Sequence, residues 1–343
     1  MDDRATIWLK AAELARSGVP AALATISRRH GSLPMASDAK MLVTTDGRRW
    51  GTVGGGCVEA DVTEQALLAI GQGSPVSVTH TLNADLAGDI GLSCGGTAEF
   101  FIEPVLTSPE AVALYAGVAA AISSRVPTVV YTAAKWEGGP RKAACGGLPT
   151  GPHLPPMHAV GSLDRFPTID DDNVTTLFDR ETDIFVESIP RVPRVVIFGA
   201  GHVGLEIAKL ASSVGFYTVV IDDREEFANT ERLPWVQEVI PEDFRSVLDR
   251  FVFDEDDFVL ATTRGHSFDA YIIQRTAASP ARYVGMLGSK RKKAVIMKAL
   301  AEAGVPRDAL DRVVTPIGLD IRADTPAEIA VSVVAELVKV RRG

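Results

Sequence analysis

Apolar positions along the first 134 residues follow both helical and strand periods. Residues 6–16 place Ile7, Ala11, Leu14 and Ala15 at helical spacing, and Gly18 follows as a stop signal. Further helices are expected after residue 56, through Leu68, and over 111–122. Short apolar runs predict strands over 21–26, 41–44, 50–53, 76–82, 97–105 and 128–132. Asp46-Gly47 indicates a hairpin turn whose two central residues both have positive φ.

Prolines and glycines without periodicity occupy much of residues 135–193. This range is interpreted as a connection, with a possible strand over 183–189. From residue 194 onward, apolar runs at 195–198, 217–221, 258–262, 283–287 and 313–317 alternate with helical segments. Such alternation indicates a parallel sheet covered on both faces. No internal repeat is evident.

The last helix has a complete start signal. Thr325 can cap it, Pro326 suits its first position and Glu328 completes a capping box. The fold class expected is therefore α/β: a small α+β domain over residues 1–134, the connection over 135–193, and a Rossmann-like doubly wound parallel-sheet domain over 194–343.

A dinucleotide-type loop follows the first strand of the C-terminal domain. Gly199, Gly201 and Gly204 form a GxGxxG string that includes His202 and opens a helix. In this context the glycines permit a tight turn, the approach of a pyrophosphate and close helix packing. Asp222 ends the next strand, where an acid accepts a ribose 2′-hydroxyl. NAD or another unphosphorylated nucleotide is therefore expected in preference to NADP, although Arg224 nearby weakens that preference. The alternative is that the glycines serve packing alone.

Two glycine-rich loops in the N-terminal domain carry cysteines. Gly54, Gly55 and Gly56 precede Cys57 at the start of an expected helix, with Glu59 two residues on. Successive glycine N–H groups can hold an anion, and a helix N-terminus favours a thiolate, which is a soft metal ligand. In a second loop, Cys94 is followed directly by Gly95 and Gly96. The alternative is that both cysteines are buried small hydrophobes, which is the expectation for Cys145.

Three polar positions at expected strand ends are further candidates. His266 could hydrogen-bond a cofactor or cap the next helix. Ser289 and Lys290 begin the main basic run of the chain, residues 290–293, which could contact a phosphate or be a solvated helix start.

Composition narrows the class of partner. Lys plus Arg number 35 against 44 Asp plus Glu, a net charge of −9, which disfavours nucleic acids and anionic membranes as partners. Hydrophobic residues make up 46%, enough for well-packed cores. Three cysteines do not form a disulfide framework, and no apolar stretch reaches membrane-spanning length. We therefore expect a cytoplasmic protein.

Six strings together resemble the XdhC/CoxI family, the xanthine dehydrogenase accessory proteins. They are GTVGGGCVE (51–59), SCGG (93–96), VIFGAGHVG (196–204), VIDDR (220–224), YVGMLGSKRK (283–292) and GLDIRADTPAEIA (318–330). Two features depart from the family pattern. Arg322 stands where similar sequences have glycine, and residues 32–38 lack the expected proline-rich run.

The resemblance implies a non-catalytic chaperone for molybdenum cofactor, either molybdopterin or its cytosine dinucleotide. Such a chaperone protects the cofactor during sulfuration and delivers it to a molybdenum hydroxylase. By the same resemblance a cysteine desulfurase is the sulfurtransferase partner. The thiolate of Cys57 is the expected metal contact, because it is a soft ligand at a helix start. A homodimer would suit a protein that must hand over its cargo. The alternative from the residues alone is an NAD-dependent oxidoreductase. A thiol redox or zinc protein is disfavoured because the cysteines are not in CxxC or zinc-like spacing.

Overall fold

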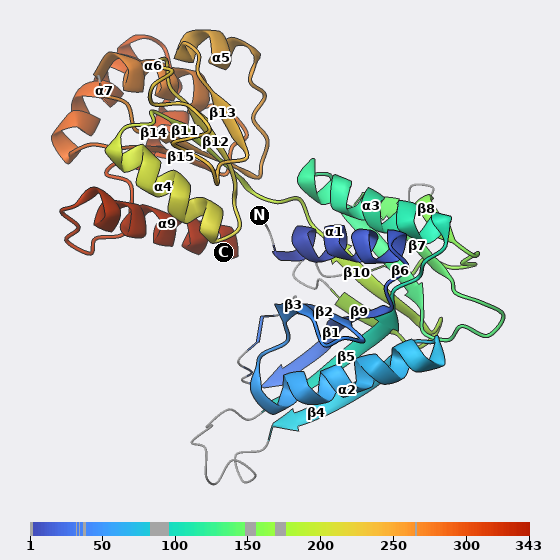
Figure 1. Cartoon of the computed structure of the whole chain (residues 1–343). Helices are drawn as coiled ribbons and strands as arrows, with labels where there is room; N and C mark the ends of the chain where they lie inside the picture. Colours follow the sequence, from blue (N-terminus) through green and yellow to red (C-terminus); the bar gives the residue numbers. More distant parts are fainter. Residues whose placement is uncertain are drawn as a thin grey trace, which may run out of the picture. The chain divides into compact units, whose positions relative to one another are not determined.

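The computed structural model divides the chain into two compact units, one ending at Arg191 and the other beginning at Val192. Figure 1 shows both units, coloured along the sequence. The structure describes residues 3–31, 33, 35–36, 39–82, 96–147, 156–168, 176–264 and 266–343. Among these residues no helix is long and apolar enough to cross a membrane.

The N-terminal unit contains two five-stranded antiparallel sheets. The first has the order β3-β2-β1-β5-β4 and the second the order β8-β7-β6-β10-β9. The elements of the first half are α1 (Asp3–Arg16), β1 (Ala21–Gly31), β2 (Lys40–Thr44), β3 (Arg49–Thr52), α2 (Gly56–Gln72), β4 (Val76–Leu82) and β5 (Gly96–Pro104). Those of the second half are α3 (Pro109–Ser123), β6 (Thr128–Ala133), β7 (Lys142–Gly146), β8 (Pro156–Val160), β9 (Thr176–Asp179) and β10 (Ile184–Ile189). The α+β character expected of the first domain is confirmed.

The hairpin between β2 and β3 is present, but its turn differs from the expected one. Gly47 has a φ of 84°, whereas Asp46 is not among the positive-φ residues. The amide of Thr44 donates to Arg48 O at 3.0 Å, and that of Gly47 donates to Thr44 O at 3.0 Å. The turn therefore closes over more residues than a two-residue loop, and one glycine supplies the left-handed conformation.

Residues 135–193 are not a linker, because four strands lie within them. β7 pairs with β6 and β8, and β10 pairs with β6 and β9. The sequence pattern missed β7 since its centre is Ala143-Ala144, which lacks the β-branched residues that signal a strand. Both alanines are buried, so small side chains here reflect close packing.

The two sheets repeat one topology, which contradicts the expectation of no internal repeat. In each half a helix precedes three strands, and two further strands return so that the last of them pairs with the first. Pairing registers match as well. Lys40 lies opposite Thr25, as Lys142 lies opposite Thr132. Both halves also have a Val-Pro dipeptide, before β1 and before β6. Most other positions differ, because apolar residues can exchange without changing the fold.

Glutamates complete the correspondence between the repeats. Glu103 on β5 pairs with Leu23, and Glu187 on β10 pairs with Val130. Leu23 and Val130 are equivalent, because each lies two residues before the threonine that pairs with the lysine of its repeat. The charged pairs cross between the repeats. Lys40 Nζ lies 2.9 Å from Glu187 Oε2, and Lys142 Nζ pairs with Glu103 Oε1. All four residues are at most 5% exposed.

Aromatic residues follow the same reciprocal pattern. Trp8 of α1 contacts Tyr115 of α3 with ring centroids 5.9 Å apart. Phe101 stacks on Phe185 at 4.6 Å, and the register shows that these are equivalent residues. Contacts that are exchanged in this way characterise a two-fold interface, here between two halves of one chain. The ring centroid of Trp8 is 4.9 Å from Lys40 Nζ and 5.3 Å from Lys142 Nζ, so cation–π attraction joins the two ion pairs.

The C-terminal unit is a Rossmann fold, as expected. Its five strands are all parallel in the order β13-β12-β11-β14-β15. Separate apolar cores lie on the two faces of the sheet, each covered by helices (Figure 1). The elements are β11 (Arg194–Phe198), α4 (His202–Ser213), β12 (Tyr217–Ile221), β13 (Glu238–Ile240), α5 (Phe244–Arg250), β14 (Asp257–Ala261), α6 (His266–Thr276), β15 (Tyr283–Met286), α7 (Lys290–Glu302), α8 (Arg307–Asp311) and α9 (Pro326–Arg342).

Two local expectations for this unit have opposite outcomes. The capping box of α9 is confirmed, with the Thr325 side chain accepting from Glu328 N and the Glu328 carboxylate accepting from Thr325 N. The strand expected over 313–317 is wrong, because only Val314 forms a bridge, to Gly285. Pro316 has no N–H to donate, which prevents the ladder from continuing there.

Candidate functional site

The glycine–cysteine loop, residues 51–57, connects β3 to α2. Gly54, Gly55 and Gly56 have φ values of 113°, 78° and 61°, which L-amino acids rarely adopt. A Cβ on Gly54 would lie 2.9 Å from Met35 Cε, so this glycine lets the loop pack onto Met35. A Cβ on Gly55 or Gly56 would meet nothing within 4 Å. The loop thus has an inner glycine for packing and two glycines that face open space.

Cys57 lies in the first turn of α2, and its side chain is exposed. The N-cap residue is Gly55, which makes no side-chain capping hydrogen bond. The first N–H groups of a helix have no intrahelical partner, and here no side chain caps them. A thiol and uncapped amide donors therefore lie at the same helix end, which suits a ligand that carries both a soft metal and an anionic group.

Glu59 is held in position by β3. The Thr52 hydroxyl donates to Glu59 Oε1, and Arg49 Nη1 lies 3.7 Å from Glu59 Oε2. Thr52 Oγ1 also accepts from Gly54 N at 3.2 Å, which joins this network to the loop. The Glu59 side chain is 20% exposed. Its carboxylate is therefore fixed on the first turn of α2, two residues after Cys57.

The second cysteine loop is only partly visible. Cys94 and Gly95 lie outside the described residues. Gly96 begins β5 opposite Gly31, and a Cβ there would lie 2.5 Å from His30 O, so close strand packing requires this glycine. Cys145 is 2% exposed, and burial raises the pKa of its thiol. Its expected structural role agrees with that burial.

The glycine loop of the C-terminal unit has the geometry that the fingerprint predicts. Gly199 has a φ of 111°, and a Cβ there would lie 2.7 Å from Thr262 O. A Cβ on Gly204 would collide with Gly199 O, whereas one on Gly201 would meet nothing within 4 Å. Gly201 is also the N-cap of α4 and makes no side-chain cap. The loop can therefore receive a phosphate at Gly201.

Asp222 is fully occupied by protein donors. Its Oδ2 accepts from Ala200 N at 2.7 Å and from Arg224 Nη2 at 2.9 Å. Its Oδ1 accepts from Arg224 Nε at 2.8 Å and from Arg224 N at 3.1 Å. Burial alone would raise the pKa of Asp222, but the hydrogen bonds from Arg224 and Ala200 outweigh it and leave that pKa below its ordinary value. This carboxylate anchors the glycine loop to Arg224.

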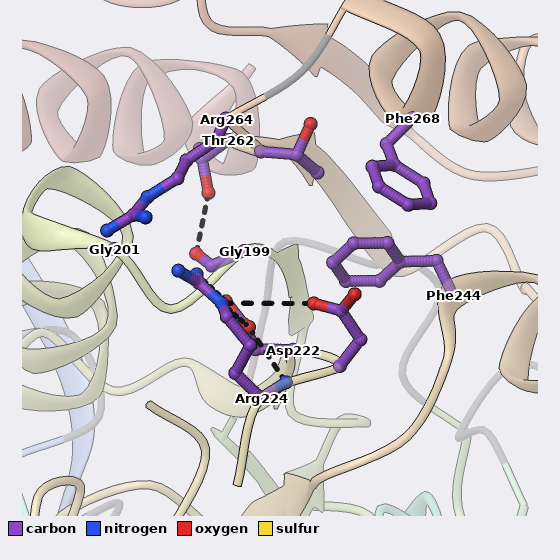
Figure 2. Close-up of a pocket in the computed structure, with 10 residues that line it drawn as sticks. Gly199, Gly201, Asp222, Arg224, Phe244, Thr262, Arg264 and Phe268 are labelled. Atoms are coloured by element: carbon purple, nitrogen blue, oxygen red, sulfur yellow. Dashed lines mark hydrogen bonds and ion pairs between the residues drawn. The ribbon is translucent and has the colours of Figure 1, made fainter. Parts of the chain in front are cut away.

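A pocket of about 230 Å³ opens beside the glycine loop (Figure 2). It is lined by Gly199, Gly201, Asp222, Asp223, Arg224, Phe244, Thr262, Thr263, Arg264 and Phe268. The pocket lies at the carboxyl ends of β11, β12 and β14, where open α/β sheets bind ligands. It brings together three of the predicted residues, Gly199, Gly201 and Asp222.

The remaining candidates lie outside this lining. His202 is exposed at the first position of α4. His266 begins α6 and Lys290 begins α7, but the described part of the structure does not include their side chains. Ser289 is the N-cap of α7, where its hydroxyl accepts from Lys292 N at 3.2 Å.

Two cations of the basic run have structural roles. Lys292 Nζ pairs with Asp269, which is fully buried, and donates to Leu287 O at 2.9 Å. Lys293 Nζ donates to Val313 O at 2.8 Å. The run is therefore more than a solvated helix start, because Lys292 and Lys293 both make tertiary contacts. Neither of these two ammonium groups is free to bind a phosphate.

Several residues of the pocket are not among the candidates expected from the sequence. Thr262, Thr263 and Arg264 could have been found, since Thr262 ends the expected strand and the other two follow it at the ligand-binding edge of the sheet. Phe244 and Phe268 carry no such signal, because their side chains reach the pocket from helices after loops of unpredictable length. Across the described residues no group of three or more His, Cys, Asp or Glu side chains could hold a metal ion.

Comparison with known proteins covers both units. A family model described as "XdhC Rossmann domain" matches residues 195–337, and one described as "XdhC and CoxI family" matches residues 14–82. A Bacillus subtilis protein, named as a probable subunit of xanthine dehydrogenase, is 28% identical over 330 residues, covering 94% of this chain and 93% of that protein.

Two further relatives extend the match over nearly the whole chain. The Escherichia coli "Molybdenum cofactor insertion chaperone PaoD" is 24% identical over 341 residues, covering 99% of this chain and 89% of the relative. A crystal structure of a protein titled a xanthine dehydrogenase from Bacillus halodurans matches with a TM-score of 0.77 and 28% identity, covering 100% of this chain and 96% of that one. The two family models together span more than half of the chain, and on this basis the protein belongs to the XdhC and CoxI family.

Proposed function

We propose that this protein is an accessory factor in the maturation of a molybdenum hydroxylase of the xanthine dehydrogenase type. It binds molybdenum cofactor, as molybdopterin or its cytosine dinucleotide, protects it during sulfuration and delivers it to the client enzyme. The names of two relatives, a molybdenum cofactor insertion chaperone and a probable xanthine dehydrogenase component, support this role. The cofactor is cargo here, and the protein itself performs no catalytic step.

The observation that carries the proposal is the exposed thiol of Cys57 at the uncapped start of α2. A thiolate is a soft ligand suited to a thiolate-rich metal centre, and the free amide donors of a helix start suit the phosphate of the pterin. Gly55 and Gly56 leave open space beside both groups. Glu59, fixed by Thr52 and Arg49, supplies a carboxylate that can accept a proton near the metal.

The proposed partners follow from this role. They are the client hydroxylase, a cysteine desulfurase that supplies the sulfur, and a second copy of the chain in a homodimer. A net charge of −9 supports a partner set without nucleic acid or anionic membrane. The small number of cysteines supports a reducing compartment, the cytoplasm.

The main support for the alternative, an NAD-dependent oxidoreductase, was the expected role of Asp222 in binding the ribose of NAD. That carboxylate was expected to accept ribose hydroxyls, but Ala200 and Arg224 already occupy both of its oxygens. No observation favours hydride transfer over cofactor delivery, and we do not propose it.

Activation of a client tests the proposal. Apo-hydroxylase of the xanthine dehydrogenase type is incubated with limiting sulfurated molybdenum cofactor, alone or with this protein. Wild-type protein is expected to raise the yield of active hydroxylase, and Cys57→Ala is expected to abolish most of that gain. Cys145→Ala, which removes the buried thiol, serves as the matched control and is expected to act as wild type. An equal yield with and without the wild-type protein contradicts the proposal.

A further inference from the structure

In the pocket of the C-terminal unit, the carboxylate of Asp222 at the end of the second strand is not available to an unphosphorylated ribose. In NAD sites the acid at the end of the second strand accepts the ribose 2′-hydroxyl. A carboxylate offers about four acceptor positions. Asp222 accepts four hydrogen bonds from Ala200 and Arg224, and its side chain is only 2% exposed. It therefore has no capacity left for a ligand hydroxyl.

Guanidinium groups gather at the same place. Phe227, in the segment after β12, has the Cζ atoms of Arg224, Arg232 and Arg264 at 3.8, 4.6 and 5.3 Å from its ring centroid. Among the described residues, Arg232 and Arg264 form no ion pair, whereas Arg224 is paired with Asp222. The guanidinium groups of Arg224 and Arg264 therefore lie over the same ring, and both residues line the pocket.

Aromatic side chains form the opposite wall. Phe244 and Phe268 meet edge to face with centroids 5.2 Å apart, and both line the pocket. Figure 2 shows Arg224 and Arg264 extending to one side of the pocket and the two phenylalanines standing on the other. A base can stack against the aromatic wall while a charged substituent of its ribose faces the arginines.

One carboxylate in the pocket remains accessible. The Asp223 side chain is 39% exposed, and its nearest charged partner is Arg224 Nε at 3.9 Å. It can accept a neighbouring ribose hydroxyl that carries no phosphate. The cavity of about 230 Å³ is below the range of roughly 300–1,000 Å³ typical of whole ligands, so it suits one nucleotide half.

We propose that this pocket binds the nucleoside end of a 2′-phosphorylated adenine nucleotide of the NADP type, with the 2′-phosphate against Arg264 and Arg224. The 5′-phosphate then lies at Gly201 and the start of α4, and the base lies against Phe244 and Phe268. This reverses the preference for NAD that Asp222 suggested from the sequence. The assignment is independent of the proposed cargo, because it concerns a second ligand and a different unit of the chain.

Calorimetric titration of the full-length protein, free of molybdenum cofactor, tests the inference. Two matched ligand pairs differ only in the 2′-phosphate: adenosine 2′,5′-bisphosphate against 5′-AMP, and NADP⁺ against NAD⁺. Charge-assisted hydrogen bonds from two guanidinium groups are expected to give the phosphorylated member at least about tenfold tighter binding. Equal affinities, tighter binding of 5′-AMP or NAD⁺, or no binding of any of the four overturns the proposal.

Variants at Arg264 and Arg245 test where the 2′-phosphate of the ligand binds. Arg264→Gln is expected to remove most of the preference for adenosine 2′,5′-bisphosphate while leaving the affinity for 5′-AMP unchanged. Arg245→Gln is the matched control, since Arg245 also lies over an aromatic ring, that of Tyr271, but does not line the pocket. A preference that survives Arg264→Gln overturns the assignment.

A third ligand distinguishes this pocket from a binding site for the cargo. CDP contains the cytidine and the pyrophosphate of the cytosine dinucleotide form of molybdenum cofactor, and it has no 2′-phosphate. Binding of CDP more tightly than adenosine 2′,5′-bisphosphate overturns the proposal and identifies the pocket as a site for cargo. Failure of this inference leaves the client-activation experiment on Cys57 unaffected.

Discussion

The two repeats of the N-terminal unit share a scaffold but differ in what is attached to it. Each contributes a helix, a five-stranded sheet and one lysine and one glutamate to the exchanged ion pairs. The first inserts the glycine–cysteine loop and α2 between its third and fourth strands. At the same place in the second, residues 161–168 contain no helix, and Leu163 and Phe166 pack on the sheet.

The cysteines of the two repeats show the same contrast. Cys57 of the first repeat is exposed at a helix start, whereas Cys145 of the second lies buried in a strand. The exchanged contacts between the repeats therefore belong to the repeated parts, and the unrepeated insertion carries the candidate chemistry while α2 packs on the first sheet. Predictions about stability should apply to both repeats, and predictions about cargo to the first alone.

Removing one glutamate from either exchanged pair should have the largest effect. Glu187→Ala leaves Lys40 without its carboxylate partner, and Glu103→Ala does the same to Lys142. In each variant the ammonium group becomes an uncompensated buried charge. We expect each to lower the free energy of unfolding by about 3–5 kcal/mol. Urea unfolding followed by tryptophan fluorescence measures this loss, because Trp8, Trp50 and Trp136 lie in this unit.

An exposed pair supplies the control for these two variants. Lys135 Nζ lies 2.8 Å from Asp183, but both side chains are largely exposed, and Lys135→Ala should leave the urea midpoint unchanged. A large loss from one glutamate variant and almost none from the other would show that the two pairs are not equivalent.

Replacing a whole pair should have a smaller effect of the opposite sign. The double variant Lys40→Met with Glu187→Leu removes both buried charges and keeps apolar volume in their place. Its free energy of unfolding should equal that of wild type or exceed it by about 1–4 kcal/mol. If the double variant is destabilised as much as Glu187→Ala, the cost lies in packing rather than in an unpaired charge.

The residue before each Val-Pro dipeptide should give the smallest difference. Gly18 and Arg125 both adopt left-handed backbone, with φ values of 65° and 57°. Gly18→Ala should cost about 1 kcal/mol of unfolding free energy, and Arg125→Gly should gain about 0.5–1 kcal/mol. A Cβ on Gly18 meets nothing within 4 Å, so backbone conformation alone sets its cost. Changes of the same sign at both positions contradict the equivalence.

The C-terminal unit was predictable because its signals are local. The three glycines of the loop and the Thr325 capping box each depend on residues within one turn, and the structure has them as predicted. Arg322 has a φ of 58°, a backbone conformation that glycine adopts without strain. Such local conformational requirements can be predicted from a few neighbouring residues.

The features that were missed depend on contacts across long sequence distances. Lys40 and Glu187 are 147 residues apart, so their pairing cannot be inferred from either neighbourhood. Asp222 and Arg224 are two residues apart, yet the sequence does not show that Arg224 folds back over the carboxylate instead of leaving it open. The position of the candidate carboxylate was predicted correctly, but its availability was not.

Retention of molybdenum by the purified protein tests the central claim most directly. Wild type, Cys57→Ala and Cys145→Ala are each mixed with molybdenum cofactor and passed through gel filtration, and molybdenum per chain is measured. Wild type and Cys145→Ala should retain equal amounts, and Cys57→Ala should lose most of its molybdenum while eluting at the same volume. Retention by Cys57→Ala equal to that of wild type would contradict the assignment of cargo binding to the first repeat.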